Sequence, residues 1–168
     1  RNKYFILITL AFAVIYTSLG LTGGSRIYYA KYVLGDEMLN STMTMFNYIP
    51  TILTIMLIPV FTKRFGKIKA LFVGFLFYAA GLVLEIAGPV NLPMIYTGLV
   101  LQGIGHAALY SCLFAIVGDV VDYSEWKDGI REEGITYSVT SFGQKIGTGL
   151  GTAALGWILA AGHYDGTA

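Results

Sequence analysis

Long apolar stretches with few or no charged side chains constrain this chain more than any other feature of its sequence. The hydrocarbon core of a bilayer is about 30 Å thick, and a helix of about 20 apolar residues spans it. Five such stretches are present; the third carries Glu85 near its end, and the fifth carries Lys145. The sequence therefore predicts an all-α transmembrane protein with five spans, at residues 4–23, 42–61, 70–87, 93–118 and 135–161.

Composition excludes several other classes of protein. Only 12% of the 168 residues are charged, against about 25% in a soluble domain. A formal net charge of +1 argues against a nucleic-acid binder. The single cysteine, Cys112, excludes an intrachain disulfide framework and a CxxC metal site. Because no GxSxG, HExxH or P-loop pattern is present, an enzyme is not expected.

Basic residues are distributed unevenly between the two sides of the predicted spans. Two of them, Arg26 and Lys31, fall on the side where the first span ends, next to a group of tyrosines at residues 28, 29 and 32. The positive-inside rule therefore predicts that the other side, with the N-terminus, is cytoplasmic. That side collects eight basic residues: Arg1, Lys3, Lys63, Arg64, Lys67, Lys69, Lys127 and Arg131.

Lys145 lies ten positions after Ile135, which is about 15 Å along a helix and close to the middle of the bilayer. A lysine at that depth costs roughly 2.5–3.5 kcal/mol on insertion scales, so it must face protein or water. We interpret Lys145 as part of an ion or substrate pathway. The alternative is a structural ion pair with a helix outside this chain.

Two stripes run along the fifth span. One is polar and includes Lys145, and the other consists of glycines spaced by four on roughly the opposite face. We expect the polar face to line a cavity and the glycine face to pack closely against a neighbouring helix. The polar stripe is Ser138, Ser141, Lys145, Thr148 and Thr152, and the glycine stripe is Gly143, Gly147 and Gly151.

The fourth span has a second polar line, in which Gln102, His106 and Tyr110 are spaced by four. These side chains can hydrogen-bond a polyhydroxylated ligand, and a tyrosine can stack on a sugar ring. They can equally hold helices together, as Gln and His do in membrane bundles. A metal role for His106 is not expected, because the only other histidine, His163, is near the far end of the chain.

A charged segment at residues 119–138 is the most specific motif of the chain. Its pattern is an Asp, an Asp-Tyr pair, then Glu, Trp, Lys, Arg, Glu and Tyr-Ser, followed seven residues later by Lys145. The segment resembles the connection between helices ten and eleven of the glycoside–pentoside–hexuronide:cation symporters. That family is the melibiose-permease-like branch of the major facilitator superfamily.

The resemblance implies a major-facilitator-type helix bundle, in which the five spans are helices 7–11 of 12. The N-terminal half, a partner in the same transporter, and the last helix would then lie outside this chain. Lys145 matches a lysine implicated in cation and sugar coupling, and Thr140 and Ser141 match sugar-facing positions. The family's acidic ligands for the coupling cation, Na⁺ or H⁺, lie on the N-terminal helices. No other cofactor is expected.

The charged segment also predicts a cytoplasmic gate loop at residues 119–133, which contains six acidic and two basic residues. A gate needs different contacts in two conformations, and such a cluster can supply them. The alternative is a solvated loop that sets the helix ends. The gate residues would be Asp119, Asp122, Tyr123, Glu125, Lys127, Arg131 and Glu133.

These patterns together predict a secondary transporter in the bacterial cytoplasmic membrane, which moves a sugar or glycoside with a cation. Two alternatives stay open. One is transport of another solute on the same fold, as in lysophospholipid carriers. The polar line of the fourth span and the polar stripe of the fifth favour a polar solute. The other is a non-transporting membrane subunit, which would leave the mid-membrane Lys145 unexplained.

Overall fold

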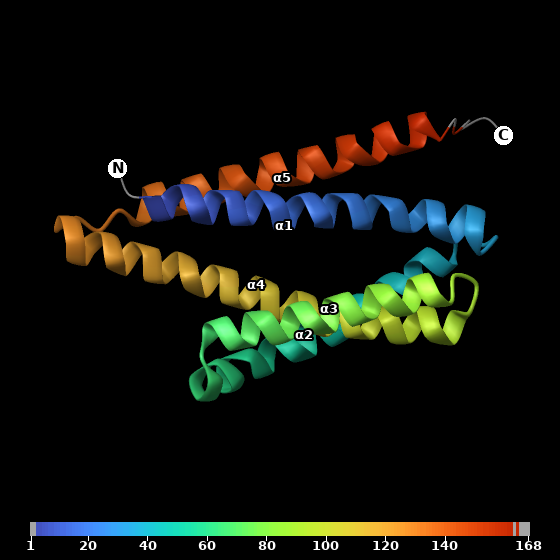
Figure 1. Ribbon diagram of the computed structural model, residues 1–168, viewed down its shortest axis with the longest axis horizontal. Coiled ribbons are helices and arrows are strands. Elements are labelled where there is room, and N and C mark those ends of the chain that lie inside the picture. The colour runs from blue at the N-terminus through green and yellow to red at the C-terminus, as the bar shows by residue number, and fades with distance from the viewer. Residues whose placement is uncertain (1–2, 163, 165–168) are drawn as a thin grey trace. The chain divides into compact units, whose positions relative to one another are not determined.

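The computed structural model describes residues 3–162 and 164. Arg1, counted above among the cytoplasmic basic residues, and His163, the second histidine, lie outside the described residues. Every secondary-structure element of the described residues is a helix (Figure 1). Those elements are α1 (Lys3–Tyr28), the π-helical turn η1 (Tyr29–Val33), α2 (Leu39–Phe65), α3 (Lys67–Ala87), α4 (Leu92–Asp128) and α5 (Glu133–Ala161).

By length and composition, four described segments are long and apolar enough to cross a membrane: Tyr4–Val33, Leu39–Phe65, Lys67–Ala87 and Leu92–Lys127. The predicted fifth span, α5, is long enough at 29 residues but is not among them. The lysine, glutamine, serine, threonine and glycine residues of α5 lower its mean hydropathy. The same kinds of residue made α5 the candidate for the site.

Two helix boundaries differ from the prediction. The first helix does not end near Gly23 but continues through η1 to Val33, and Gly35 with φ +75° follows it. The predicted loop at 119–133 is mostly wrong, because α4 runs on to Asp128 and only residues 129–132 connect it to α5. Hydropathy marks where a helix leaves the membrane. The helix itself continues until a breaker, here Gly129 with φ +70°.

The chain divides into two compact units, residues 1–28 with 117–168 and residues 29–116. In the first, called the α1/α5 unit, α1 and α5 lie side by side along their lengths (Figure 1). The second, called the α2/α3 unit, holds η1, α2, α3 and the first part of α4. The functional candidates fall into both units.

Polar side chains connect helices inside the α2/α3 unit. The Asn47 amide of α2 donates to the carbonyl oxygen of Leu99 on α4 at 3.1 Å, and the Thr51 hydroxyl lies 3.0 Å from the carbonyl oxygen of Gly103. Both side chains are buried. Such bonds average about 0.6 kcal/mol in membrane proteins, so they fix the register of the two helices more than they stabilise the fold.

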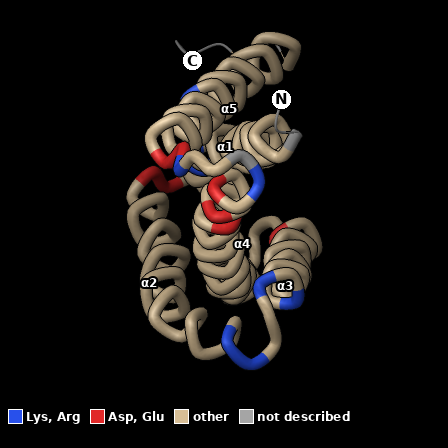
Figure 2. The backbone as a smooth tube through the Cα atoms, turned by 90° about the vertical axis from the view of Figure 1, so that its left-hand side faces the viewer, with Lys and Arg blue, Asp and Glu red and all other residues tan. Residues whose placement is uncertain are grey.

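Charged residues gather mainly at the helix ends and connections, as the coloured backbone of Figure 2 shows. All charged residues at the turn between α2 and α3 are basic: Lys63, Arg64, Lys67 and Lys69. It is as tight as predicted, because Gly66 alone separates the two helices and has φ +87°. The bodies of the helices between these ends are largely uncharged, as membrane-spanning segments require.

Candidate functional site

The glycine stripe of α5 sets the orientation of this helix. Gly143, Gly147 and Gly151 are buried, and each faces a backbone carbonyl of α1. A Cβ atom added at Gly143 would stand 2.7 Å from the carbonyl oxygen of Thr9, and one at Gly147 would overlap that of Ala13. The absence of side chains therefore allows α1 and α5 to approach backbone to backbone.

The polar stripe lies on the other side of α5. Ser138, Ser141, Lys145 and Thr148 are all exposed. The hydroxyl of Ser138 donates to the carbonyl oxygen of Gly134 at 2.8 Å, and Thr148 donates to that of Gln144 at 3.0 Å. Because these hydroxyl protons are used within the helix, the oxygens present lone pairs outward as hydrogen-bond acceptors.

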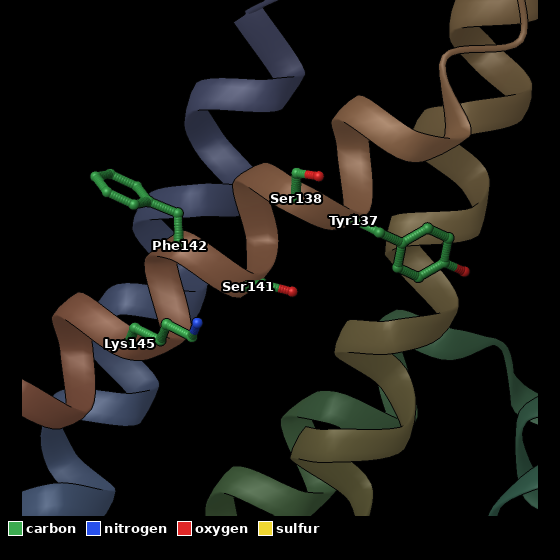
Figure 3. A pocket seen from close by; sticks show the side chains of 5 residues that line it. All are labelled: Tyr137, Ser138, Ser141, Phe142 and Lys145. Atoms are coloured by element: carbon green, nitrogen blue, oxygen red, sulfur yellow. The ribbon is translucent and has the colours of Figure 1, made fainter.

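A hollow of about 470 Å³ lies on this face of α5, lined by Tyr137, Ser138, Ser141, Phe142 and Lys145. Its volume falls within the range of small-molecule sites, about 300–1,000 Å³. Tyr137, Ser141 and Lys145 recur every four residues and project to the same side of the helix (Figure 3). The hollow thus joins a cation, hydroxyl groups and aromatic rings, which together can bind a polyhydroxylated ring.

Thr140 does not share this face with Ser141. It is 2% exposed, and its hydroxyl donates to the carbonyl oxygen of Tyr137 at 2.9 Å. The expectation that both residues face a sugar is therefore corrected for Thr140 in this structure. Adjacent positions on a helix are about 100° apart, so Thr140 falls on the buried face with Thr136 and Gly143.

A contact beside Lys145 was not predicted from the sequence. The side-chain amide of Gln144 donates to the hydroxyl oxygen of Tyr16 on α1 at 3.1 Å, and Tyr16 stacks on Phe12 with ring centroids 6.0 Å apart. This bond holds the turn that carries Lys145 against α1. Tyr137 and Phe142 were also missed as lining residues, although the four-residue spacing from Tyr137 to Lys145 could have revealed Tyr137.

The polar line of α4 has a different setting. Gln102 and His106 are 2% and 8% exposed. A Cβ atom added at Gly81 of α3 would stand 2.7 Å from Cγ of Gln102. The ring of His106 lies 4.8 Å from that of Tyr78 on α3 and 5.6 Å from that of Tyr110. These residues lie at the contact between α3 and α4, which favours the interpretation that they hold helices together.

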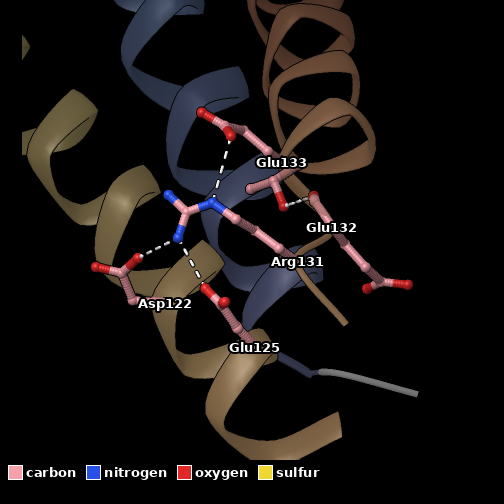
Figure 4. Close-up of polar contacts among 6 residues, drawn as sticks. Asp122, Glu125, Arg131, Glu132 and Glu133 are labelled. Atoms are coloured by element: carbon pink, nitrogen blue, oxygen red, sulfur yellow. Dashed lines mark hydrogen bonds and ion pairs between the residues drawn. The ribbon is translucent and has the colours of Figure 1, made fainter. Parts of the chain in front are cut away.

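Arg131 is the centre of the charged cluster at the α4–α5 connection (Figure 4). Its Nη1 atom lies 2.7 Å from a carboxylate oxygen of Glu125 and 3.3 Å from one of Asp122, and its Nε atom lies 3.4 Å from one of Glu133. Hydrogen bonds to Glu125 and Glu133 raise the pKa of Arg131 above its ordinary value. It therefore stays positive throughout the physiological range.

The other predicted gate residues lie on α4 rather than in a loop. The ring of Tyr123 packs edge-on against that of Tyr4 on α1, with centroids 4.9 Å apart. Asp119 and Lys127 are both exposed. The cluster therefore joins α4, the connection and the start of α5 through Arg131, with Tyr123 as a contact to α1.

Apolar helices of spanning length, with an exposed lysine and hydroxyl groups on one helix face, are typical of integral membrane transport proteins. The chain belongs to the MFS/sugar transport protein family, whose model matches residues 1–168. This confirms the resemblance to sugar:cation symporters of the major facilitator superfamily that the motif at 119–138 predicted.

Curated relatives carry names of transporters or carriers. The isoprimeverose transporter of Lactiplantibacillus pentosus is 30% identical over 98% of this chain and 34% of its own length. The glucuronide carrier protein homolog of Escherichia coli (strain K12) is 28% identical over 98% of this chain and 36% of its own. The raffinose carrier protein of Pediococcus pentosaceus is 24% identical over 94% of this chain and 25% of its own.

This chain thus spans about a third of the length of the first two relatives. No solved structure matches it significantly. The names of the relatives agree with the prediction of a non-enzymatic membrane protein.

Proposed function

We propose that this chain contributes part of the substrate pathway of a secondary transporter, which moves a sugar or glycoside together with Na⁺ or H⁺ by alternating access. The observation that carries the proposal is the hollow on α5, where Lys145 lies among Ser138, Ser141 and Tyr137. A charge at this position of a membrane helix is expensive unless it serves a pathway or has a partner. The helices that complete the pathway lie outside this chain in the proposal.

The chemistry of the hollow supports a polyhydroxylated substrate over a lipid. The ammonium group of Lys145 donates hydrogen bonds, the hydroxyl oxygens accept them, and the ring of Tyr137 offers an apolar face. The names isoprimeverose, glucuronide and raffinose in the relatives denote sugars or sugar derivatives. A carrier of lysophospholipids needs an apolar cavity instead, whereas this face of α5 carries Lys145 and two serine hydroxyl groups.

Uptake by the intact transporter tests the proposal. We expect saturable uptake of labelled glycosides into cells or proteoliposomes, and faster uptake when an inward Na⁺ or H⁺ gradient is imposed. A collapsed gradient with the same protein serves as the control. Uptake at the rate of empty vesicles, for a panel of neutral and acidic glycosides, would contradict a sugar substrate. Uptake that is independent of both gradients would contradict symport.

The cluster around Arg131 is proposed as a cytoplasmic latch that closes in one of the transport conformations. Its three carboxylates come from two helices, Asp122 and Glu125 on α4 and Glu133 on α5. A change in the relative position of those helices would break some of these ion pairs. In the proposal, the positive-inside rule places this cluster on the cytoplasmic side of a bacterial inner membrane.

Substitution of Arg131 separates a latch from a solvated surface cluster. We expect Arg131→Gln to lower the maximal uptake rate a few-fold, because exposed ion pairs shift a conformational equilibrium only modestly, with the melting temperature unchanged for the same reason. Arg26→Gln removes one basic charge at the end of α1, outside the predicted gate residues, and is the control. Equal uptake by both variants would show that the cluster takes no part in transport, and Arg131→Lys should recover part of the rate.

A further inference from the structure

The α2/α3 unit contains a groove that the transport proposal does not use. Its volume is about 160 Å³, close to that of an apolar cavity that stays dry and binds hydrocarbon. Small residues create it: Ala70 and Gly74 on α3 face Ala108 on α4 and leave space beside α2. The groove is lined by Thr54, Leu57, Ile58, Phe61, Ala70, Val73, Gly74, Phe77, Ile104 and Ala108.

The basic turn lies at one end of this groove. Phe61 precedes Lys63 by two residues, and Ala70 follows Lys69 directly. Lys63, Arg64 and Lys69 are exposed, and none of the described carboxylates forms an ion pair with them. Figure 2 shows the basic residues together at this turn. Lys67 is used differently, since its Nζ atom donates to the carbonyl oxygen of Ala115 at 3.2 Å.

We propose that the groove and the basic turn together bind an anionic phospholipid, with one acyl chain between α2 and α3 and the phosphate at Lys63, Arg64 and Lys69. From Phe61 to Thr54 the groove follows α2 for about 10 Å, which is long enough for a segment of an acyl chain. Basic residues at the end of a membrane helix attract anionic lipids at about 1 kcal/mol each. The charge of the turn therefore selects an anionic headgroup over a zwitterionic one.

Two features distinguish this site from general attraction to a charged surface. The acyl groove is formed by side chains of three helices, so its occupant has a fixed place and a fixed stoichiometry. Its wall includes Leu57 and Val73, which are 66% and 36% exposed, so a lipid can enter from the side. A lipid held only by the turn would not depend on these two residues.

Native mass spectrometry of the intact protein in detergent, titrated with phosphatidylglycerol or phosphatidylethanolamine, tests the proposal. We expect one phosphatidylglycerol to bind preferentially. Lys63→Gln/Lys69→Gln should weaken its binding roughly 30-fold, from two lost charges. The matched control Arg26→Gln/Lys31→Gln removes two charges at the end of the first helical segment and should leave binding unchanged.

The groove is tested with two pairs of variants. Val73→Trp fills it, and Leu57→Ser weakens its apolar wall without added bulk. The controls Leu76→Trp and Leu53→Ser change exposed residues of the same helices outside the groove. Both groove variants should lose the preferential lipid, and both controls should retain it.

Three results would overturn the proposal. One is equal binding of the two lipids by the unaltered protein. Another is loss of binding in the charge variant while Leu57→Ser binds as well as Leu53→Ser, because this would show surface attraction alone. The third is that the unaltered protein binds no lipid and that Val73→Trp gives a lower yield of folded protein. Another helix of the transporter would then occupy the groove.

Discussion

Uptake by the intact transporter should fall roughly 10- to 100-fold when Lys145 is replaced by Met. The expected loss corresponds to one hydrogen bond to a charged group, about 1.5–3 kcal/mol. Lys145 lines the hollow with Ser138 and Ser141, so its ammonium group is placed to contact a substrate there. The measurement is the initial rate of uptake under an imposed cation gradient, normalised to protein in the membrane.

Poor membrane insertion would not explain this loss, since removing a lysine from the proposed mid-membrane position makes insertion more favourable. Ile146→Met introduces the same side chain one position further, outside the hollow, and should transport normally. Lys145→Arg keeps the charge and should retain more activity than Lys145→Met. Normal uptake by Lys145→Met would assign this residue a structural role.

Replacing Gly147 by Ala should destabilise the protein by about 1–3 kcal/mol, the usual effect of forcing a methyl group into a closely packed interface. The added Cβ atom would overlap the carbonyl oxygen of Ala13 and stand 2.9 Å from Cβ of Tyr16. Because backbone atoms form one side of this contact, rotation of a side chain cannot relieve it. Thermal unfolding of the purified protein in detergent measures the effect.

Gly149 provides a matched control on the same helix. A Cβ atom there meets nothing within 4 Å, so Gly149→Ala should be neutral or slightly stabilising, as alanine is favoured over glycine inside a helix. Opposite signs for the two substitutions would support the packing of α1 against α5. Equal melting temperatures would contradict it.

The spacing of residues along the helices predicted the direction of side chains reliably. Long apolar stretches located the helices, and spacing by three and four placed Ser138, Ser141 and Lys145 opposite Gly143 and Gly147. This succeeds because helix geometry converts sequence spacing directly into direction. Periodicity could not decide whether the face with Gln102 and His106 lines a cavity or packs on a helix, because both produce the same spacing.

The charged segment shows where such inference stops. Its low hydropathy indicated a loop, yet between Gly118 and Gly129 it contains no glycine or proline, and α4 continues to Asp128. The sequence placed Lys127 and Arg131 in one gate loop, whereas Lys127 lies on α4 and Arg131 lies beyond it, where it binds three carboxylates. Contacts made across a turn depend on the path of the backbone, which residue spacing does not encode.

The length of α4 has a consequence for the charges of the chain. Its 37 residues correspond to about 55 Å, well beyond the roughly 30 Å of a hydrocarbon core. Its acidic end with Asp122 and Glu125 can therefore stand in aqueous electrolyte, where mobile ions at physiological concentration limit the reach of a charge to about 8 Å. In the proposal Lys145 lies within the substrate pathway on α5, where the surrounding protein leaves less room for mobile ions. Changes in ionic strength would then act on Arg131 and its carboxylates and leave the field around Lys145 largely intact.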